Sequence, residues 1–188
     1  MFHYIMMNGF IIIMNFMLPY EIGIPETRKM ILEWKKLYED KMVYDIKNIF
    51  LTNNISFVKV NVQIHKLDKS AKYPNDIGDF DVIAIDDINK KLWIIESKFL
   101  SLVGSFYEMF EQQKNFFKKG KYIEKFQRRI DFMNLNYKRV LKSYGFYDVS
   151  NYKILYFMVF NKVIVSRYRN INIPLISITE LEEKIKNS

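Results

Sequence analysis

The chain has 188 residues, of which 49% are hydrophobic and 16% aromatic, and this suffices for one folded domain with a sizeable core. Its formal net charge of +8 favours an anionic partner, either nucleic acid or an acidic membrane surface. Cysteine is absent and there are only two histidines, which excludes disulfides, thiolate metal sites and histidine-rich zinc sites. Any bound metal would therefore have oxygen ligands, as Mg2+ or Mn2+ does.

The first 24 residues form an apolar N-terminal extension. Residues 1–18 are strongly apolar, but polar residues and a glycine, Asn8 and Gly9 among them, interrupt the run. A membrane-spanning helix needs about 20 apolar residues, and a signal peptide needs a basic start and a small-residue cleavage site, neither of which is visible. We expect a buried strand or short helix here, or the remnant of a longer chain, and no membrane role.

Residues 25–188 are predicted to form a single domain that opens with a long helix. Pro25 is typical of a first helical turn, and the helical pattern runs to about Leu51. The apolar positions Met42, Val43 and Ile46 make one stripe, and their spacing places Glu39 on the same inward face.

The rest of the domain alternates strand and helix patterns. Strands are predicted over 56–67, 79–85, 91–98, 151–160 and 162–165, with a short edge strand over 176–179. Helices are predicted over 103–118 and 122–144, where Gly145 is the stop, and a last helix begins with Thr179 and Glu182 as a capping box. The expected fold is α/β, with a mixed sheet of about four to five strands flanked by helices.

The strands over 79–85 and 91–98 carry charged residues where core residues are expected. Glu96 and Lys98 share one face of their strand, and an antiparallel hairpin around 86–90 brings Asp81 near Glu96. A lone carboxylate is costly in a dry sheet, and two together repel. A divalent cation relieves both problems, because Mg2+ binds a few carboxylates and keeps several waters.

A structural explanation of the same residues is a solvated strand end. Asp81 would then cap the preceding loop, and Glu96 and Lys98 would form a salt bridge at the edge of the sheet. The sequence favours the site, because VIAI directly follows Asp81 and LWII directly precedes Glu96, and both are buried-strand patterns.

The arrangement GDFD with Asp81, followed by ESK with Glu96 and Lys98, resembles that of the PD-(D/E)XK, or restriction-endonuclease-like, nucleases. The core of that superfamily is a helix, a three-stranded meander, a helix and a further strand, and the likeness covers about residues 36–120. It implies that Asp81 and Glu96 bind the metal, that Glu39 assists, and that Lys98 acts on the attacking water and the phosphate. Phe80 stands where the superfamily name has proline.

A basic segment follows the charged strand pair. The residues expected to contact phosphates are Lys118, Lys119, Lys121, Lys125, Arg128 and Arg129. Gln112 and Gln113 lie in the next predicted helix, where some members of the superfamily have a helper residue, and either one, Gln113 first, could serve. The structural alternative is a solvated helix face over a core stripe of aromatic side chains.

The sequence thus predicts a Mg2+- or Mn2+-dependent nuclease, an endonuclease-like phosphodiesterase, with nucleic acid as substrate and DNA as the first expectation. The alternative is a non-catalytic nucleic-acid- or protein-binding module on the same fold. A third hypothesis attaches the domain to a membrane through residues 1–18. A cytoplasmic location and a homodimer are further expectations; DNA or RNA, and internal or terminal cleavage, stay open.

Overall fold

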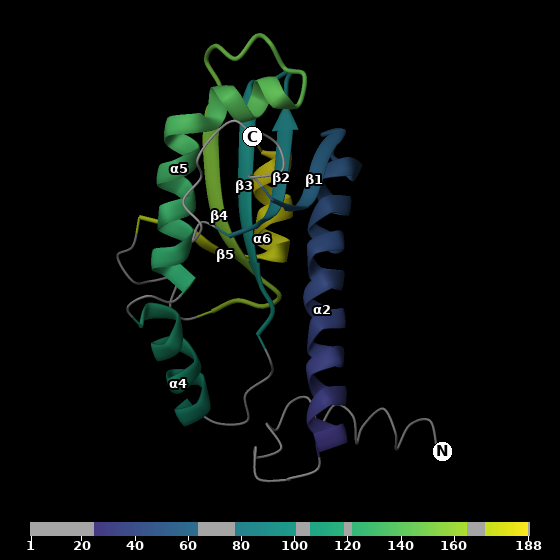
Figure 1. Ribbon diagram of the computed structural model, residues 1–188, viewed down its shortest axis with the longest axis vertical. Coiled ribbons are helices and arrows are strands. Elements are labelled where there is room, and N and C mark those ends of the chain that lie inside the picture. Colours follow the sequence, from purple (N-terminus) through teal and green to yellow (C-terminus); the bar gives the residue numbers. More distant parts are fainter. Residues whose placement is uncertain (1–24, 64–77, 101–105, 119–121, 165–171, 188) are drawn as a thin grey trace.

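The computed structural model describes residues 25–63, 78–100, 106–118, 122–164 and 172–187. The described chain is α/β, and a mixed five-stranded sheet lies between helices (Figure 1). The N-terminal extension, residues 1–24, lies outside the described residues, so what was expected of it stays a prediction.

The sheet combines an antiparallel meander with a parallel half. Its strands are β1 (Phe57–Val62), β2 (Phe80–Asp86), β3 (Lys91–Lys98), β4 (Lys153–Phe160) and β5 (Leu175–Ser177), in that spatial order. Strands β1, β2 and β3 pair antiparallel, while β3, β4 and β5 run parallel. The predicted hairpin is confirmed. The strand predicted over 162–165 is wrong for residues 162–164, which have no strand structure.

Four helices are described, and all four were predicted: α2 (Pro25–Thr52), α4 (Phe106–Phe117), α5 (Tyr122–Ser143) and α6 (Ile178–Lys186). The stop at Gly145 is confirmed, since this residue has a positive φ of 89°. The amide of Gly145 donates to Lys142 O and that of Phe146 donates to Leu141 O, each at 3.0 Å. This pair of bonds is a Schellman motif, which satisfies carbonyls at the end of α5.

The predicted cap of α6 is wrong by two residues. Ser177, the last residue of β5, is the N-cap; its side chain accepts from Glu180 N, and the Glu180 side chain accepts from Ser177 N. Thr179 lies inside the helix. The pattern of a hydroxyl residue followed three positions later by glutamate occurs twice in this stretch, and the strand end selects the first.

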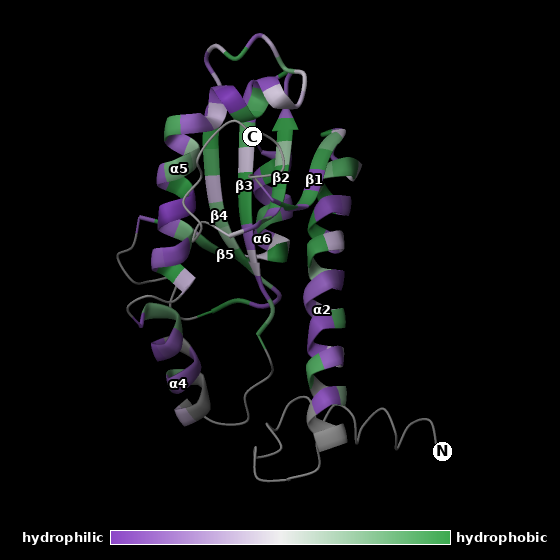
Figure 2. Cartoon of the chain, in the orientation of Figure 1, coloured by the Kyte–Doolittle hydropathy of each residue, from purple (hydrophilic) through white to green (hydrophobic). Residues whose placement is uncertain are grey.

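The two faces of the sheet carry separate hydrophobic clusters. On one face, Val82, Trp93 and Ile95 pack against the second half of α2 and against α6. On the other, Ile83 and Ile94 pack against residues of α5 that include Phe126 and Ile130. Figure 2 shows the hydrophobic colour concentrated on the strands and mixed with hydrophilic positions on the helices. The sheet is thus buried on both faces, as its strand sequences predict.

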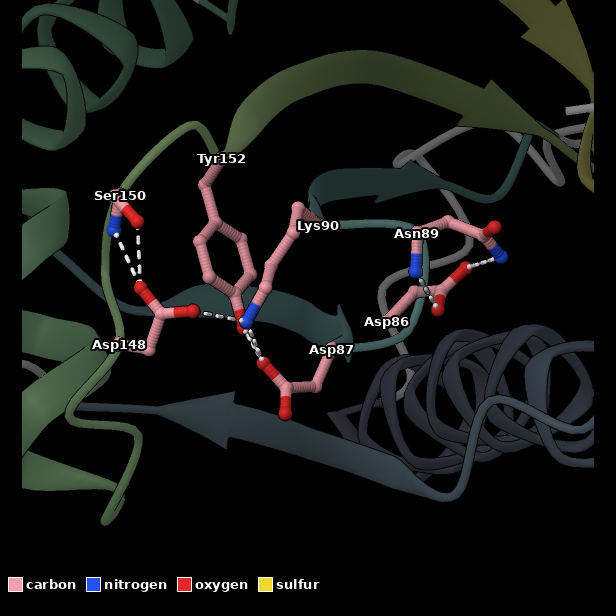
Figure 3. Close-up of polar contacts among 7 residues, drawn as sticks. All are labelled: Asp86, Asp87, Asn89, Lys90, Asp148, Ser150 and Tyr152. Atoms are coloured by element: carbon pink, nitrogen blue, oxygen red, sulfur yellow. Dashed lines mark hydrogen bonds and ion pairs between the residues drawn. The ribbon is translucent and has the colours of Figure 1, made fainter.

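A polar clasp holds the end of the sheet at which β2 turns into β3. Lys90 Nζ lies 2.8 Å from Asp87 Oδ1 and 3.0 Å from Asp148 Oδ2, so it joins the hairpin turn to the segment before β4 (Figure 3). The Tyr152 hydroxyl also donates to Asp87, and Ser150 donates to Asp148. These groups satisfy one another, and the clasp lies at the opposite end of β3 from Glu96 and Lys98.

Among the described residues, no helix is both long and apolar enough to cross a membrane.

Candidate active site

Asp81 and Glu96 lie side by side at one end of the β2–β3 pair. Val82 pairs with Ile95 in the antiparallel register, so Asp81 and Glu96 are opposite one another one position further along. Opposite residues share a face and have Cβ atoms about 5 Å apart. Here that face is the one covered by α5, because Ile83 and Ile94 on it belong to the cluster of that helix. The predicted convergence of the two acids is confirmed.

Glu96 is a buried carboxylate held by two cations. It is 5% exposed, and Lys98 Nζ lies 2.7 Å from its Oε1. Its Oε2 accepts a hydrogen bond from Arg129 Nη1, which comes from α5. Because an isolated buried charge is very costly, these two ion pairs are what allow Glu96 to stay inside the protein.

Asp81 is held by the residue that follows Glu96. Its Oδ2 accepts hydrogen bonds from Ser97 N at 2.7 Å and from Ser97 Oγ at 3.1 Å. Burial, and then the negative charge of Glu96, raise the pKa of Asp81 to about 6, although Lys98 and the Ser97 hydrogen bonds oppose the shift. The ionised form of Asp81 is therefore disfavoured, and a nearby cation would favour it.

The first turns of α5 cover this group of charges. Lys98 Nζ lies 5.2 Å from the centre of the Tyr122 ring, a cation–π distance. A Cβ atom built on Gly78 would lie 3.0 Å from Arg129 Nη2, so the guanidinium packs against bare backbone just before β2. We call Asp81, Glu96, Lys98 and Arg129 the charged cluster.

Glu39 does not lie on the buried face of α2, and that expectation is wrong. Its side chain is 48% exposed and pairs with Lys35 at 3.8 Å. Among the described side chains of α2, the first buried one is Met42, three residues after Glu39. The N-terminal end of α2 extends beyond the sheet (Figure 1). Tyr38, its neighbour, stacks on Phe99 with ring centres 5.3 Å apart.

The residues expected to contact nucleic acid fall into three groups. Lys118, Lys125 and Arg128 are exposed, as a phosphate-binding role requires. Arg129 is only 13% exposed and belongs to the charged cluster. Lys119, Lys121 and the side chain of Gln113 lie outside what the structure describes, so their roles stay predictions.

Three contributors to the site were missed or misassigned from the sequence. Ser97 is the hydrogen-bond donor to Asp81, Tyr122 lies over Lys98, and Arg129 binds Glu96 and was expected only at a phosphate. The contact of Ser97 was accessible from the sequence. Ser97 follows Glu96, which the hairpin places opposite Asp81, so its backbone amide is close to the Asp81 side chain. The contacts of Tyr122 and Arg129 depend on how α5 crosses the sheet, and no local sequence pattern predicts that crossing.

The charged cluster offers few ligands to a metal. Within the described ranges, no three His, Cys, Asp or Glu residues come together as a metal-binding group. Asp81 and Glu96 nevertheless fit Mg2+, which is bound through one or two carboxylates together with water and substrate phosphates. Both hydrogen bonds to Asp81 among the described residues reach Oδ2, and none reaches Oδ1.

Comparisons of this chain with protein-family models, with curated proteins and with solved structures returned no match.

Proposed function

We propose that this protein is a Mg2+- or Mn2+-dependent nuclease that hydrolyses phosphodiester bonds of nucleic acid, with DNA as the first substrate to test. The observation that carries the proposal is the charged end of the β2–β3 pair. Two carboxylates are opposite one another there, and Lys98 is on the same face. The order of helix, antiparallel meander, helices and parallel strand also agrees with the restriction-endonuclease-like core.

In this proposal each residue has a separate task. Asp81 and Glu96 would hold the metal ion, which supplies an activated water and charge stabilisation for an in-line displacement. Lys98 would donate to the attacking water and to the phosphate oxygens on which charge develops. Lys118, Lys125 and Arg128 would bind the substrate backbone. Glu39 would act only through water, since its carboxylate is exposed and paired with Lys35.

The alternative is a non-catalytic module that binds nucleic acid or a protein. One observation favours it: both oxygens of Glu96 are already neutralised, by Lys98 and Arg129, so Glu96 is stable there without a metal. The exposed basic residues Lys118, Lys125 and Arg128 would then bind nucleic acid without any cleavage. The expected homodimer and cytoplasmic location stay predictions under either function.

The test is cleavage of circular plasmid, linear plasmid and labelled single strands with Mg2+, Mn2+ or EDTA. We expect metal-dependent cutting by the wild type. In Glu96→Gln and in Lys98→Met the cutting rate should fall by about a hundredfold or more. Glu183→Gln removes an equal charge from an exposed position of α6 and is expected to cut normally.

The outcomes separate the two functions. Cutting that survives in Glu96→Gln would exclude this site. Absence of cutting, together with retention of nucleic acid that is lost at high salt, would favour the binding module.

A further inference from the structure

Arg129 binds Glu96 at the place where the proposed nuclease would bind its metal ion. Its Nη1 donates to Glu96 Oε2, while Lys98 holds Oε1, so both oxygens of Glu96 carry a cation. Each oxygen keeps a second lone pair, but a metal ion on Glu96 would lie close to at least one of these two cations and be repelled by it. Lys98 is fixed two residues along the same strand, whereas Arg129 reaches the acid from α5 on a long side chain.

The charges of the cluster point in the same direction. Two acids and two bases give a formal charge of zero, so a divalent cation alone would leave the cluster at +2. An incoming phosphodiester supplies negative charge, and a guanidinium binds phosphate as well as it binds carboxylate, through two parallel N–H groups. The metal would release Arg129 from Glu96 and so make it available to a phosphate. The phosphate would offset the excess positive charge that opposes metal binding.

Arg129 lies next to exposed backbone. Its Nη2 is close to Gly78, an exposed residue that has no side chain. The exposed Lys125 and Arg128 belong to the same helix, so phosphates bound there would approach the cluster from the α5 side.

We propose that Arg129 couples the metal to the substrate: it holds Glu96 when the site is free and binds a substrate phosphate when the metal takes Glu96. This proposal rests on the proposed nuclease function. It makes Arg129 a substrate-binding residue whose exchange of partners gives cooperative binding. By linkage, the nucleic acid must then tighten metal binding by the same factor by which the metal tightens nucleic-acid binding.

The experiment measures Mn2+ affinity, by the electron paramagnetic resonance signal of free Mn2+, with and without a short phosphorothioate DNA duplex. A denaturing gel verifies that the duplex stays intact. In the wild type we expect the duplex to tighten Mn2+ binding about fivefold or more. In Arg129→Met, Mn2+ should bind about tenfold more tightly without the duplex, and the duplex should add less than about twofold.

The control is Arg139→Met, which removes an equal charge from an exposed position about 15 Å further along α5. It should behave as the wild type, because charges at that distance are screened. Arg129→Lys keeps the charge but loses the planar guanidinium, so the coupling between Mn2+ and duplex should be weaker. This variant replaces Arg129→Met in the experiment if Arg129→Met unfolds below the assay temperature.

Wild-type affinity and wild-type coupling in Arg129→Met would overturn the role of Arg129 and leave the nuclease proposal standing. Failure of the nuclease proposal looks different: the wild type would bind no Mn2+ with or without the duplex, and Glu96→Gln would give the same result.

Discussion

Replacing Asp81 by asparagine should stabilise the metal-free protein at neutral pH. Asp81 is half-buried beside Glu96, and burial, followed by that neighbouring charge, raises its pKa from 3.8 to about 6. Asparagine has nearly the same shape and no charge. Its carbonyl oxygen can accept the hydrogen bonds that Ser97 N and Oγ donate to Asp81 Oδ2.

The size of the effect follows from the pKa of Asp81. Each pKa unit corresponds to about 1.4 kcal/mol, so a rise from 3.8 to about 6 corresponds to at most about 3 kcal/mol. The folded state binds the proton more tightly than the unfolded state. The wild type therefore has its full stability from this group below pH 3.8 and loses it as the pH rises through about 6. Asp81→Asn should match the wild type at low pH and exceed it by up to about 3 kcal/mol at pH 8.

The assay is urea unfolding followed by circular dichroism in EDTA buffers between about pH 4 and pH 8. The matched control is Asp79→Asn, an exposed position two residues earlier in the chain that accepts a hydrogen bond from Gln63. The gain of Asp81→Asn over the wild type at pH 8 should exceed that of this control. An Asp81→Asn protein that is no more stable than the wild type at pH 8, or differs from it equally at every pH, would show that ionised Asp81 does not destabilise the folded state.

Three further outcomes are expected. Mg2+ at about 100 times its Kd should stabilise the wild type by about 2.7 kcal/mol and raise its Tm, and Asp81→Asn should abolish the rise; equal melting with Mg2+ and EDTA would contradict the proposed metal site. Ser177→Ala should lower the free energy of unfolding by about 1 kcal/mol, whereas Thr179→Ala, within α6, should keep the cap, as urea unfolding would reveal. The pKa of Asp148 is lowered to about 2, first by Ser150 and then by Lys90, so the stability that this clasp supplies is present above pH 3.8 and lost as the pH falls through about 2. The slope of stability against pH in this range should be smaller in Asp148→Asn.

Much of the architecture could be predicted because its signals are local. Alternating or continuous apolar runs define β1 to β4, and Gly145 ends α5 because only glycine adopts its positive φ without strain. The pairing of Asp81 with Glu96 was also accessible, since a short hairpin turn fixes the register of the strands it joins. In each of these cases the residues that determine the structure lie within one short stretch of the chain.

The errors arise where the cause lies in another part of the chain. Periodicity places Glu39 on the stripe of Met42 and Ile46, but a stripe is buried only where something packs on it, and the buried part of the stripe begins at Met42. Arg129 and Glu96 are 33 residues apart, and their contact depends on the placement of α5 over β3. Asn161 follows the apolar β4 directly, and its side chain bonds the backbone of Leu100 after β3. Within the described part of the chain no strand pairs with Lys162, so the extended pattern yields no strand there.

The two acids of the charged cluster differ in a way that bears on function. A structural ion-pair network accounts for Glu96, which is buried and bound on both oxygens by Lys98 and Arg129. It does not account for Asp81, whose charged form is disfavoured and whose partner Ser97 is neutral. An uncharged residue would satisfy Ser97 at lower cost, so stability alone gives no reason for an acid at this position. A site that has to attract a cation does give one, because the energy lost by ionised Asp81 in the free protein is recovered when the cation binds. The two acids thus differ in the metal-free protein: Glu96 is neutralised by Lys98 and Arg129, whereas Asp81 supplies the unmet charge that would attract the cation.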